Sequence, residues 1–300
     1  MRYFFVLSVL CTISAIHPVI AQINVSDTLY AHNIISALCN DSLSGRGAGS
    51  RGEMYAVQMI EEEFSKLQLQ NYFKGGYSES FIFIDEKGEI LVSRNIAAYI
   101  DHQAEKTILI MAHYDHLGLG GVQSLSYTNS SIHYGADDNA SGIAVMLMTA
   151  GYLKNKSFSA YNYLLLATGA HEPGNFGSGA FVRKYGHSLQ KIALVINVDM
   201  VGRYMQNNIP FNMHSNDAGK MFFSSIDLNI LLLTYKINIR ELESGDHTPF
   251  ENAGFPVIHI TTGRHDDYHK ISDTPDKINY SGLYEIAGFI LELLKQNSNK

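Results

Sequence analysis

Histidine and acidic residues that could bind a divalent metal follow short apolar runs of this sequence, at the point where each run ends. Three runs, at 108–112, 161–168 and 192–198, are followed in chain order by His113, Asp115, Glu172 and Asp199. A single residue of this kind is usually a helix cap or an ordinary surface or core side chain. Several carboxylates brought close together, however, need a cation to remain ionised. The group therefore predicts a site for divalent metal ions.

The apolar runs themselves predict the strands that would bring these residues together. We expect strands at 108–112, 161–168, 192–198 and 257–260, and helices at 27–39, 52–67, 140–153, 176–185 and 280–295. This alternation predicts an α/β fold, a three-layer sandwich in which helices cover both faces of a mixed, mostly parallel central sheet. Ligands of such sheets bind at the carboxyl ends of the strands, where residues distant in sequence converge.

Two further segments are expected at the same edge of the sheet. The turn at 135–142 contains Asp137 and Asp138, and the loop at 265–269 ends in His269. Together they would add metal ligands and the start of a helix. Because the chain has no repeat, Pro-rich linker or charge block, we expect one domain over residues 22–300.

The first residues have the features of an export signal. Arg2 precedes an apolar stretch at 3–16, and small or β-branched residues lead up to Ala21. A membrane anchor is the alternative, but the stretch is shorter than the roughly 20 residues of a spanning helix. We therefore predict a signal peptide at 1–21, cleavage after Ala21, a secreted or periplasmic protein, and no membrane span in the mature chain.

Charge and cysteine content limit the partners and the covalent structure of the mature chain. Loss of Arg2 changes the balance from 22 basic and 29 acidic residues to 21 and 29, a net charge of −8. Nucleic acid is therefore not an expected partner. Cys39 is the one cysteine left after cleavage, so no internal disulfide can form. The sequence does not indicate an oligomeric state.

Four motifs, in this order, resemble those of the co-catalytic zinc exopeptidases, the clan of bacterial leucyl aminopeptidases, glutamate carboxypeptidases and glutaminyl cyclases. The motifs are His113-Tyr114-Asp115, residues 135–142, residues 197–203, and Asp267-Tyr268-His269 followed by residues 272–277. The resemblance runs from about residue 32 to the end of the chain. It implies the phosphorylase/hydrolase-like sandwich, peptide substrates and two zinc ions.

The resemblance also implies the zinc ligands. Asp137 would bridge the two ions, His113 and Asp199 would complete one site, and Glu172 and His269 would complete the other. Two imidazoles and three carboxylates suit zinc. Asp115 would orient the imidazole of His113, as an acid does at the matching position in the clan.

This chain departs from the clan at the position of the catalytic base, where His171 replaces a glutamate. Two zinc ions carry four positive charges and the three ligand carboxylates return three, so a neutral His171 leaves one positive charge. A tightly held hydroxide, an anionic ligand or the loss of the second ion would remove that surplus. We therefore expect two zinc ions, or one. Two nearby dications also disfavour the imidazolium that a histidine base must form.

The segment at 244–250 resembles the clan segment whose His or Tyr points at the oxyanion, which makes His247 a candidate electrophile. The alternative is that His247 begins a helix capped by Asp246. Four other histidines have no counterpart in the resemblance and are expected on the surface or in the core: His116, His133, His259 and His265.

The resemblance implies an aminopeptidase that hydrolyses the N-terminal peptide bond of short peptides. Two alternatives stay open. The first is a pseudo-peptidase, impaired by His171, that binds a peptide without cutting it. The second is a glutaminyl cyclase, although those enzymes rely on a pocket lined by indole rings and this chain contains no Trp.

Overall fold

One sheet carries the candidate site. The computed structural model describes residues 25–127, 130–205, 208–223, 235, 237–240 and 244–298. The predicted signal peptide, residues 1–21, lies outside these ranges. Within them, nine strands form the sheet: β1 (Gln70–Asn71), β2 (Ser78–Ile84), β3 (Ile90–Ile100), β4 (Thr107–His113), β5 (Asn162–Thr168), β6 (Ile192–Val198), β7 (Phe211–Ser215), β8 (Ile237–Arg240) and β9 (Val257–Thr261).

The strand order is β1-β3-β5-β4-β6-β9-β7-β8, with β2 paired to the outer part of β3. The four central strands β5, β4, β6 and β9 run parallel, whereas β3 is antiparallel to β5, and β7 is antiparallel to β9 and parallel to β8. The carboxyl ends of the central strands therefore meet at one edge of the sheet. This confirms the predicted α/β sandwich with a mixed, mostly parallel sheet.

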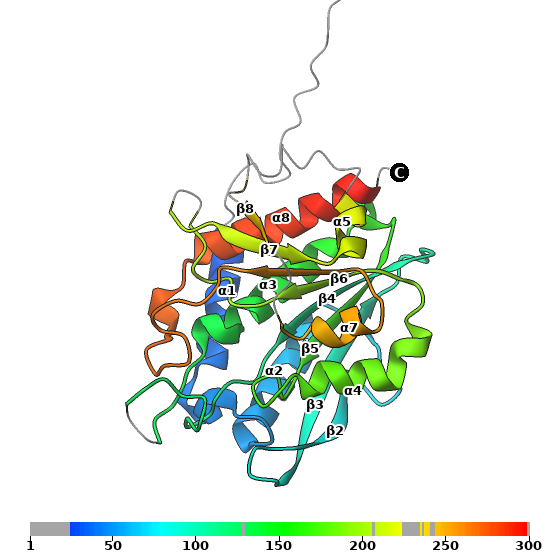
Figure 1. Ribbon diagram of the computed structural model, residues 1–300. Coiled ribbons are helices and arrows are strands. Elements are labelled where there is room, and N and C mark those ends of the chain that lie inside the picture. Colours follow the sequence, from blue (N-terminus) through cyan, green and yellow to red (C-terminus); the bar gives the residue numbers. More distant parts are fainter. Residues whose placement is uncertain are drawn as a thin grey trace, which may run out of the picture.

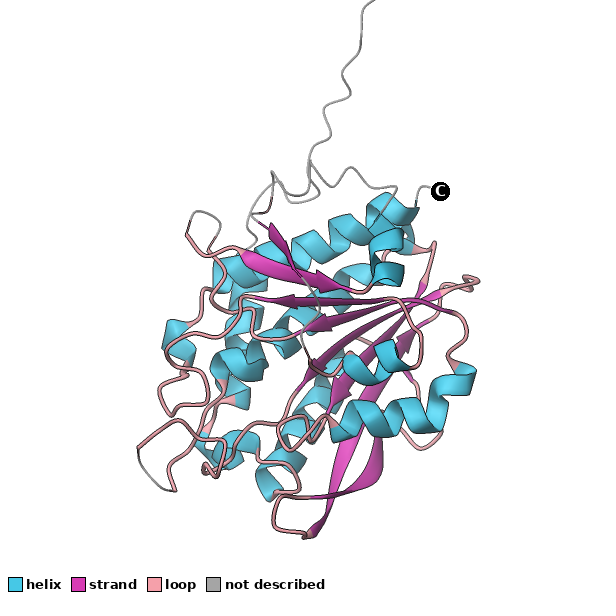
Figure 2. Ribbon diagram, in the orientation of Figure 1, coloured by secondary structure: helices cyan, strands magenta, loops and turns pink. Residues whose placement is uncertain are grey.

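Helices cover both faces of the sheet (Figures 1 and 2). They are α1 (Val25–Leu38), α2 (Arg51–Lys66), α3 (Gly142–Leu153), α4 (Phe176–Tyr185), α5 (Asp217–Phe223), α7 (Thr248–Asn252) and α8 (Tyr280–Ser298), with the short turns η1 (Asp41–Arg46), η2 (Ala136–Ser141), η3 (Lys156–Phe158), η4 (Gly186–Ser188) and η5 (Pro275–Lys277). Helices α1, α2, α3 and α8 pack on one face, and α4 and α7 on the other. Within the described residues, no helix has the length and apolar character needed to span a membrane.

Alternation along the strands divides the core into two layers. In β4, Ile108, Ile110 and Ala112 pack towards α1, α3 and α8, whereas Leu109 and Met111 pack towards α4 and α7. Because successive side chains of a strand point to opposite faces, a strand covered on both sides must be apolar throughout. This requirement explains why the central strands were visible in the sequence as unbroken apolar runs.

Several elements differ from the expected ones, and β1, β7, β8 and α5 were not expected. The helix expected at 140–153 begins as the η2 turn, and α3 starts at Gly142. The β2–β3 hairpin was not expected, and its outer part extends beyond the body of the sheet (Figure 1). Ile82 and Ile90 of this part are 67% and 73% exposed. Because these strands are not buried on both faces, their sequence lacks the unbroken apolar run that predicted the central strands.

Arg46 fixes the loop that approaches the carboxyl edge of the sheet. Its fully buried guanidinium donates hydrogen bonds of 2.6 to 3.0 Å to four backbone carbonyls, those of Leu38, Tyr114, Tyr134 and Gly135. These contacts join the end of α1, the segment after β4 and the turn before η2. A planar guanidinium with five N–H donors is suited to such a junction.

Candidate metal centre

Two groups of metal-type side chains meet at the carboxyl edge, and one carboxylate lies between them. In the first group, His113 Nε2 is 3.3 Å from Asp199 Oδ1 and 3.2 Å from Asp138 Oδ1. His113 ends β4 and Asp199 follows β6, so the parallel pairing of these strands brings them together. All four zinc ligands that the resemblance implies besides Asp137 lie at this edge of the sheet.

The second group surrounds Glu172. Its Oε1 is 2.9 Å from His116 Nδ1, and its Oε2 is 3.2 Å from His269 Nε2. The other oxygen of Asp138, Oδ2, is 3.4 Å from His269 Nε2 and 3.8 Å from His116 Nδ1. Asp138 thus faces both groups, one with each carboxylate oxygen.

The central carboxylate is therefore that of Asp138, and the structure places the expected bridging residue, Asp137, elsewhere. Asp137 Oδ1 accepts hydrogen bonds from Gly202 N at 2.5 Å and Ser141 Oγ at 3.1 Å, and its Oδ2 is 2.9 Å from His265 Nε2. Asp138 has extended backbone angles, with φ −106° and ψ 89°. Neighbouring side chains along extended backbone point in opposite directions, so only one acid of the pair can face the cluster.

Asp273 holds this turn in place. Its carboxylate accepts the backbone N–H of Asp137 at 2.9 Å and that of Asp138 at 3.1 Å, and its Oδ1 lies 3.2 Å from Arg203 Nη2. The motif at 272–277 therefore contributes through Asp273, which positions the central carboxylate.

The carboxylate of Asp115 holds the backbone of the segment after β5 and does not bind the imidazole of His113, which it was expected to orient. Its Oδ1 is 3.9 Å from His113 Nδ1, beyond hydrogen-bond distance, and Nδ1 lies instead 3.2 Å from the backbone carbonyl of Asp115. The carboxylate accepts the N–H groups of His171 at 2.9 Å and Glu172 at 3.1 Å. Burial is the main cause that raises the pKa of Asp115, to about 6.

His171 stacks on His113 and pairs with a buried acid. The two rings lie 3.8 Å apart with an interplanar angle of 11°. His171 Nδ1 is 2.9 Å from Asp246 Oδ2, which also accepts a hydrogen bond from Thr168 Oγ1 at 2.9 Å. Burial and His113 lower the pKa of His171, but Asp246 outweighs them and raises it to about 9. Burial alone would raise the pKa of Asp246, yet His171 holds it below its usual range.

The carboxylates of the cluster favour positive charge at two places. Burial lowers the pKa of His113, but Asp199 and Asp138 outweigh burial and raise it well above its ordinary value. Burial also opposes protonation of His269, whose pKa Asp138 and Glu172 nevertheless raise to about 10. In the metal-free protein, protons on these imidazoles balance the carboxylates. Imidazole nitrogen and carboxylate oxygen are zinc ligands, and zinc would displace these protons. The donor set therefore fits zinc at both places.

Residues 95–294 match the sequence profile of peptidase family M28. The chain belongs to this family. The uncharacterized protein YfbL of Escherichia coli is 28% identical over 236 residues, which are 67% of this chain and 70% of the relative. The fold is also similar to two solved structures. BSAP, a zinc aminopeptidase from Bacillus subtilis, has a TM-score of 0.71 at 16% identity and covers 89% of this chain and 94% of its own. Fimbriiglobus ruber glutaminyl cyclase has a TM-score of 0.74 at 16% identity, with coverages of 90% and 95%.

Besides Asp138, two further residues near the site were missed in the sequence. His116, expected on the surface or in the core, is buried against Glu172 and belongs to the second group. Its position three residues after His113 was the available signal. Asp246, read as a helix cap, contacts His171 and Thr168 instead. No local pattern could have shown this pairing, because the partners are 75 residues apart in the chain.

His247 occupies the cap position of α7 without a side-chain capping bond. Its ring is fully buried and stacks on His259 at 4.7 Å, and its Nδ1 lies 3.4 Å from Asn197 Nδ2. The structure thus puts His247 in a buried polar group beside β6 and β9. The neighbouring Asp246 is the residue of this segment that reaches the candidate catalytic histidine.

Proposed function

We propose that this M28 peptidase is a zinc-dependent aminopeptidase that hydrolyses the N-terminal bond of peptides. The observation that carries the proposal is the position of Asp138, whose two oxygens face the two donor groups. His113 and Asp199 would hold one zinc ion and Glu172 and His269 the other, with Asp138 shared between them. His116, at 2.9 Å from Glu172, would fix that carboxylate by a hydrogen bond.

Zinc bound there would lower the pKa of a water molecule and polarise the scissile carbonyl. The group of the chain that is placed to accept the proton is His171. The nearby zinc ions would keep its imidazole neutral before the reaction, and Asp246 binds Nδ1, so Nε2 is the nitrogen that would accept the proton. His171 would then pass the proton to the leaving amine. Asp246 performs the orienting role that a buried acid has beside a catalytic histidine.

Asp246 also removes the charge conflict that His171 creates. Four positive charges from two zinc ions meet three negative ones from Asp138, Glu172 and Asp199. The fully buried Asp246 adds a fourth. The histidine and its aspartate together therefore carry the charge that the glutamate base supplies in related enzymes. An imidazolium at His171 becomes tolerable beside two dications because its own counter-charge lies 2.9 Å away.

The test is to purify residues 22–300, measure zinc per chain and assay leucine p-nitroanilide. The variants are Asp138→Asn and, as a matched control with the same change at the adjacent residue, Asp137→Asn. We expect about two zinc ions in the wild type, loss of zinc and turnover in Asp138→Asn, and retention of both in Asp137→Asn. Equal zinc loss in the two variants would refute the assignment of the central ligand.

A second comparison separates the peptidase from a peptide-binding protein without activity. His171→Glu restores the residue found in the clan at this position. If the zinc-loaded wild type is inactive and His171→Glu is active, the site has lost its base and the aminopeptidase proposal is wrong. Release of ammonia from a peptide with N-terminal Gln, with no cleavage of leucine p-nitroanilide, would identify a cyclase instead.

We also propose that residues 1–21 direct export and are removed. The supporting feature is the charged start and apolar stretch of that segment. Mass spectrometry of the protein recovered from the periplasm or medium should give a chain beginning at Gln22. A full-length chain that stays in the cytosol would contradict this proposal.

A further inference from the structure

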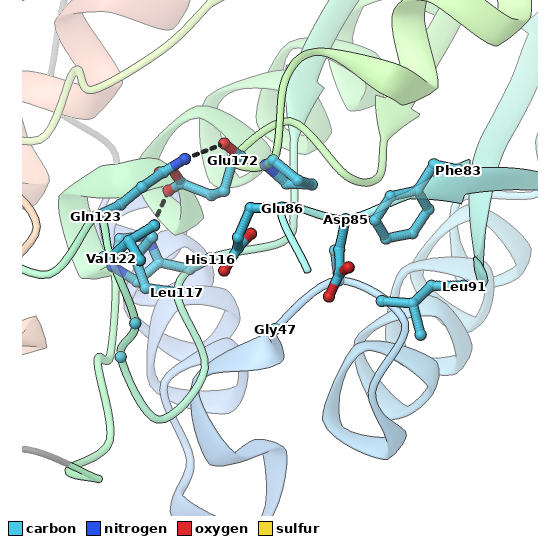
Figure 3. A pocket seen from close by; sticks show the side chains of 14 residues that line it. Gly47, Phe83, Asp85, Glu86, Leu91, His116, Leu117, Val122, Gln123 and Glu172 are labelled. Carbon is cyan, nitrogen blue, oxygen red and sulfur yellow. Dashed lines mark hydrogen bonds and ion pairs between the residues drawn. The ribbon is translucent and has the colours of Figure 1, made fainter. Parts of the chain in front are cut away.

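A cavity of ≈ 170 Å³ lies beside Glu172 and His116, next to the turn that joins β2 to β3 (Figure 3). Sites for whole small-molecule ligands usually have volumes of about 300 to 1,000 Å³. This cavity is therefore too small for a peptide but suits one long side chain. Since Glu172 is a proposed zinc ligand, a side chain in the cavity would belong to a residue next to the scissile bond.

The walls of the cavity combine apolar surface with negative charge. Apolar side chains form part of the lining: Phe83, Leu91, Leu117 and Val122. Asp85 and Glu86 add two carboxylates, and the described lining contains no Lys or Arg. Lys87, in the same turn, is not among the lining residues. An apolar stem that ends in a cation, as in lysine and arginine, matches this combination.

The carboxylate of Asp85 is held in place before any ligand arrives. Its Oδ1 accepts the backbone N–H groups of Lys87 at 2.9 Å and Glu89 at 2.8 Å, which fixes the hairpin turn. Its Oδ2 accepts no hydrogen bond from the described residues. Phe83 packs on Phe176 of α4 with ring centroids 5.4 Å apart, so the hairpin is anchored to the helix that follows Glu172. A preorganised acid loses little entropy when it binds a cation.

The inner wall of the cavity adjoins the second donor group through His116. His116 is buried, its Nδ1 is used by Glu172, and its Nε2 has no hydrogen-bond partner in the described part of the chain. His116 thus connects the wall of the cavity to the proposed zinc ligand Glu172.

We propose that the cavity is a specificity subsite for a lysine or arginine side chain adjacent to the scissile bond, with Asp85 and Glu86 as its counter-charges. The inference rests on the proposed peptidase function and names the substrate class. Glu86 is exposed and Asp85 is half-buried, whereas the side chain of Glu172 is only 7% exposed. A basic side chain would thus place its stem along the apolar walls and its charge near the turn.

The experiment compares kcat/KM for the dipeptides Lys-Leu, Leu-Lys and Leu-Leu. The variant is the double substitution Asp85→Asn, Glu86→Gln, in which the amide oxygen introduced by the first change can still accept the two turn hydrogen bonds. The matched control is Glu89→Gln, which removes an exposed charge of the same turn that does not line the cavity. Partly exposed ion pairs contribute up to about fivefold each. We expect the preference for one of the basic dipeptides over Leu-Leu to fall about tenfold in the double variant and to be unchanged in the control.

The outcomes separate this proposal from the proposed function. An equal preference in the wild type and the double variant, or no preference for either basic dipeptide, overturns the subsite while the peptidase stands. If the zinc-loaded wild type cleaves none of the three, the peptidase proposal fails, and calorimetric titration of the same protein with the dipeptides then tests the subsite. Tighter binding of a basic dipeptide that the double variant loses supports the subsite. Equal binding of all three dipeptides, or binding of none of them, overturns the subsite proposal.

Discussion

Replacing Asp246 by asparagine tests whether His171 works as a base with a charged partner. Asparagine has the same shape and can still accept the Nδ1 hydrogen bond, but it removes the buried negative charge 2.9 Å from the ring. The substitution therefore changes the charge that stabilises the imidazolium and leaves the zinc ligands as they are.

The magnitude follows from the electrostatics of the pair. The pKa of His171 is raised from 6.5 to about 9. This shift belongs to the protein without zinc; for the zinc-bound protein, a hydrogen bond to a charged group is worth up to about 3 kcal/mol, here in favour of the imidazolium. Since a histidine base is protonated in the transition state, loss of this stabilisation should lower kcat about 100-fold. We expect KM and zinc content to change little.

The assay is steady-state hydrolysis of leucine p-nitroanilide, with zinc measured in the same samples. Asp217→Asn is the control, because this acid is exposed and pairs only with the neighbouring-turn Lys220 among the described residues. A kcat within about threefold of the wild type in Asp246→Asn would refute the reasoning. It would mean that His171 does not accumulate charge during the reaction.

Three further predictions concern stability. In protein freed of zinc by a chelator, Asp246 raises the pKa of His171 to about 9. The pairing of the two residues therefore stabilises the folded protein fully below about pH 6.5, and this stabilisation is lost as the pH rises through about 9. The melting temperature of Asp246→Asn should therefore lie further below that of the wild type at pH 6.5 than at pH 10, and equal differences would contradict the pairing. Arg46→Leu should lower the free energy of unfolding by about 3 kcal/mol or more, because four backbone carbonyls lose their hydrogen-bond donor. Urea denaturation measures this change. A loss below about 1 kcal/mol would show that water replaces the guanidinium. Gly52→Ala should lower the urea concentration at the unfolding midpoint, although alanine favours helices. The reason is that the Cβ of the alanine would lie 1.8 Å from the carbonyl oxygen of Leu43. An unchanged midpoint would show that the turn before α2 can move.

The sequence by itself determined the central sheet and most of the residues at its edge. The strands β4, β5, β6 and β9 are covered on both faces, and only an unbroken apolar run satisfies that burial. Metal-type residues directly after such runs must lie at the carboxyl edge, because parallel strands end there together. His113 and Asp199 were therefore predictable from their positions alone, and the β2–β3 hairpin was not, since its outer part is exposed and has no such pattern.

The tertiary structure decided which of two adjacent acids faces the cluster and what supports His171. Asp137 and Asp138 are chemically identical, and the conformation of the turn, held by Asp273 through backbone N–H groups, alone directs one of them towards the donors. The pairing of His171 with Asp246 joins the segment after β5 to the start of α7. Such choices depend on distances between segments far apart in the chain, and residue types and their spacing along one segment carry no information about those distances.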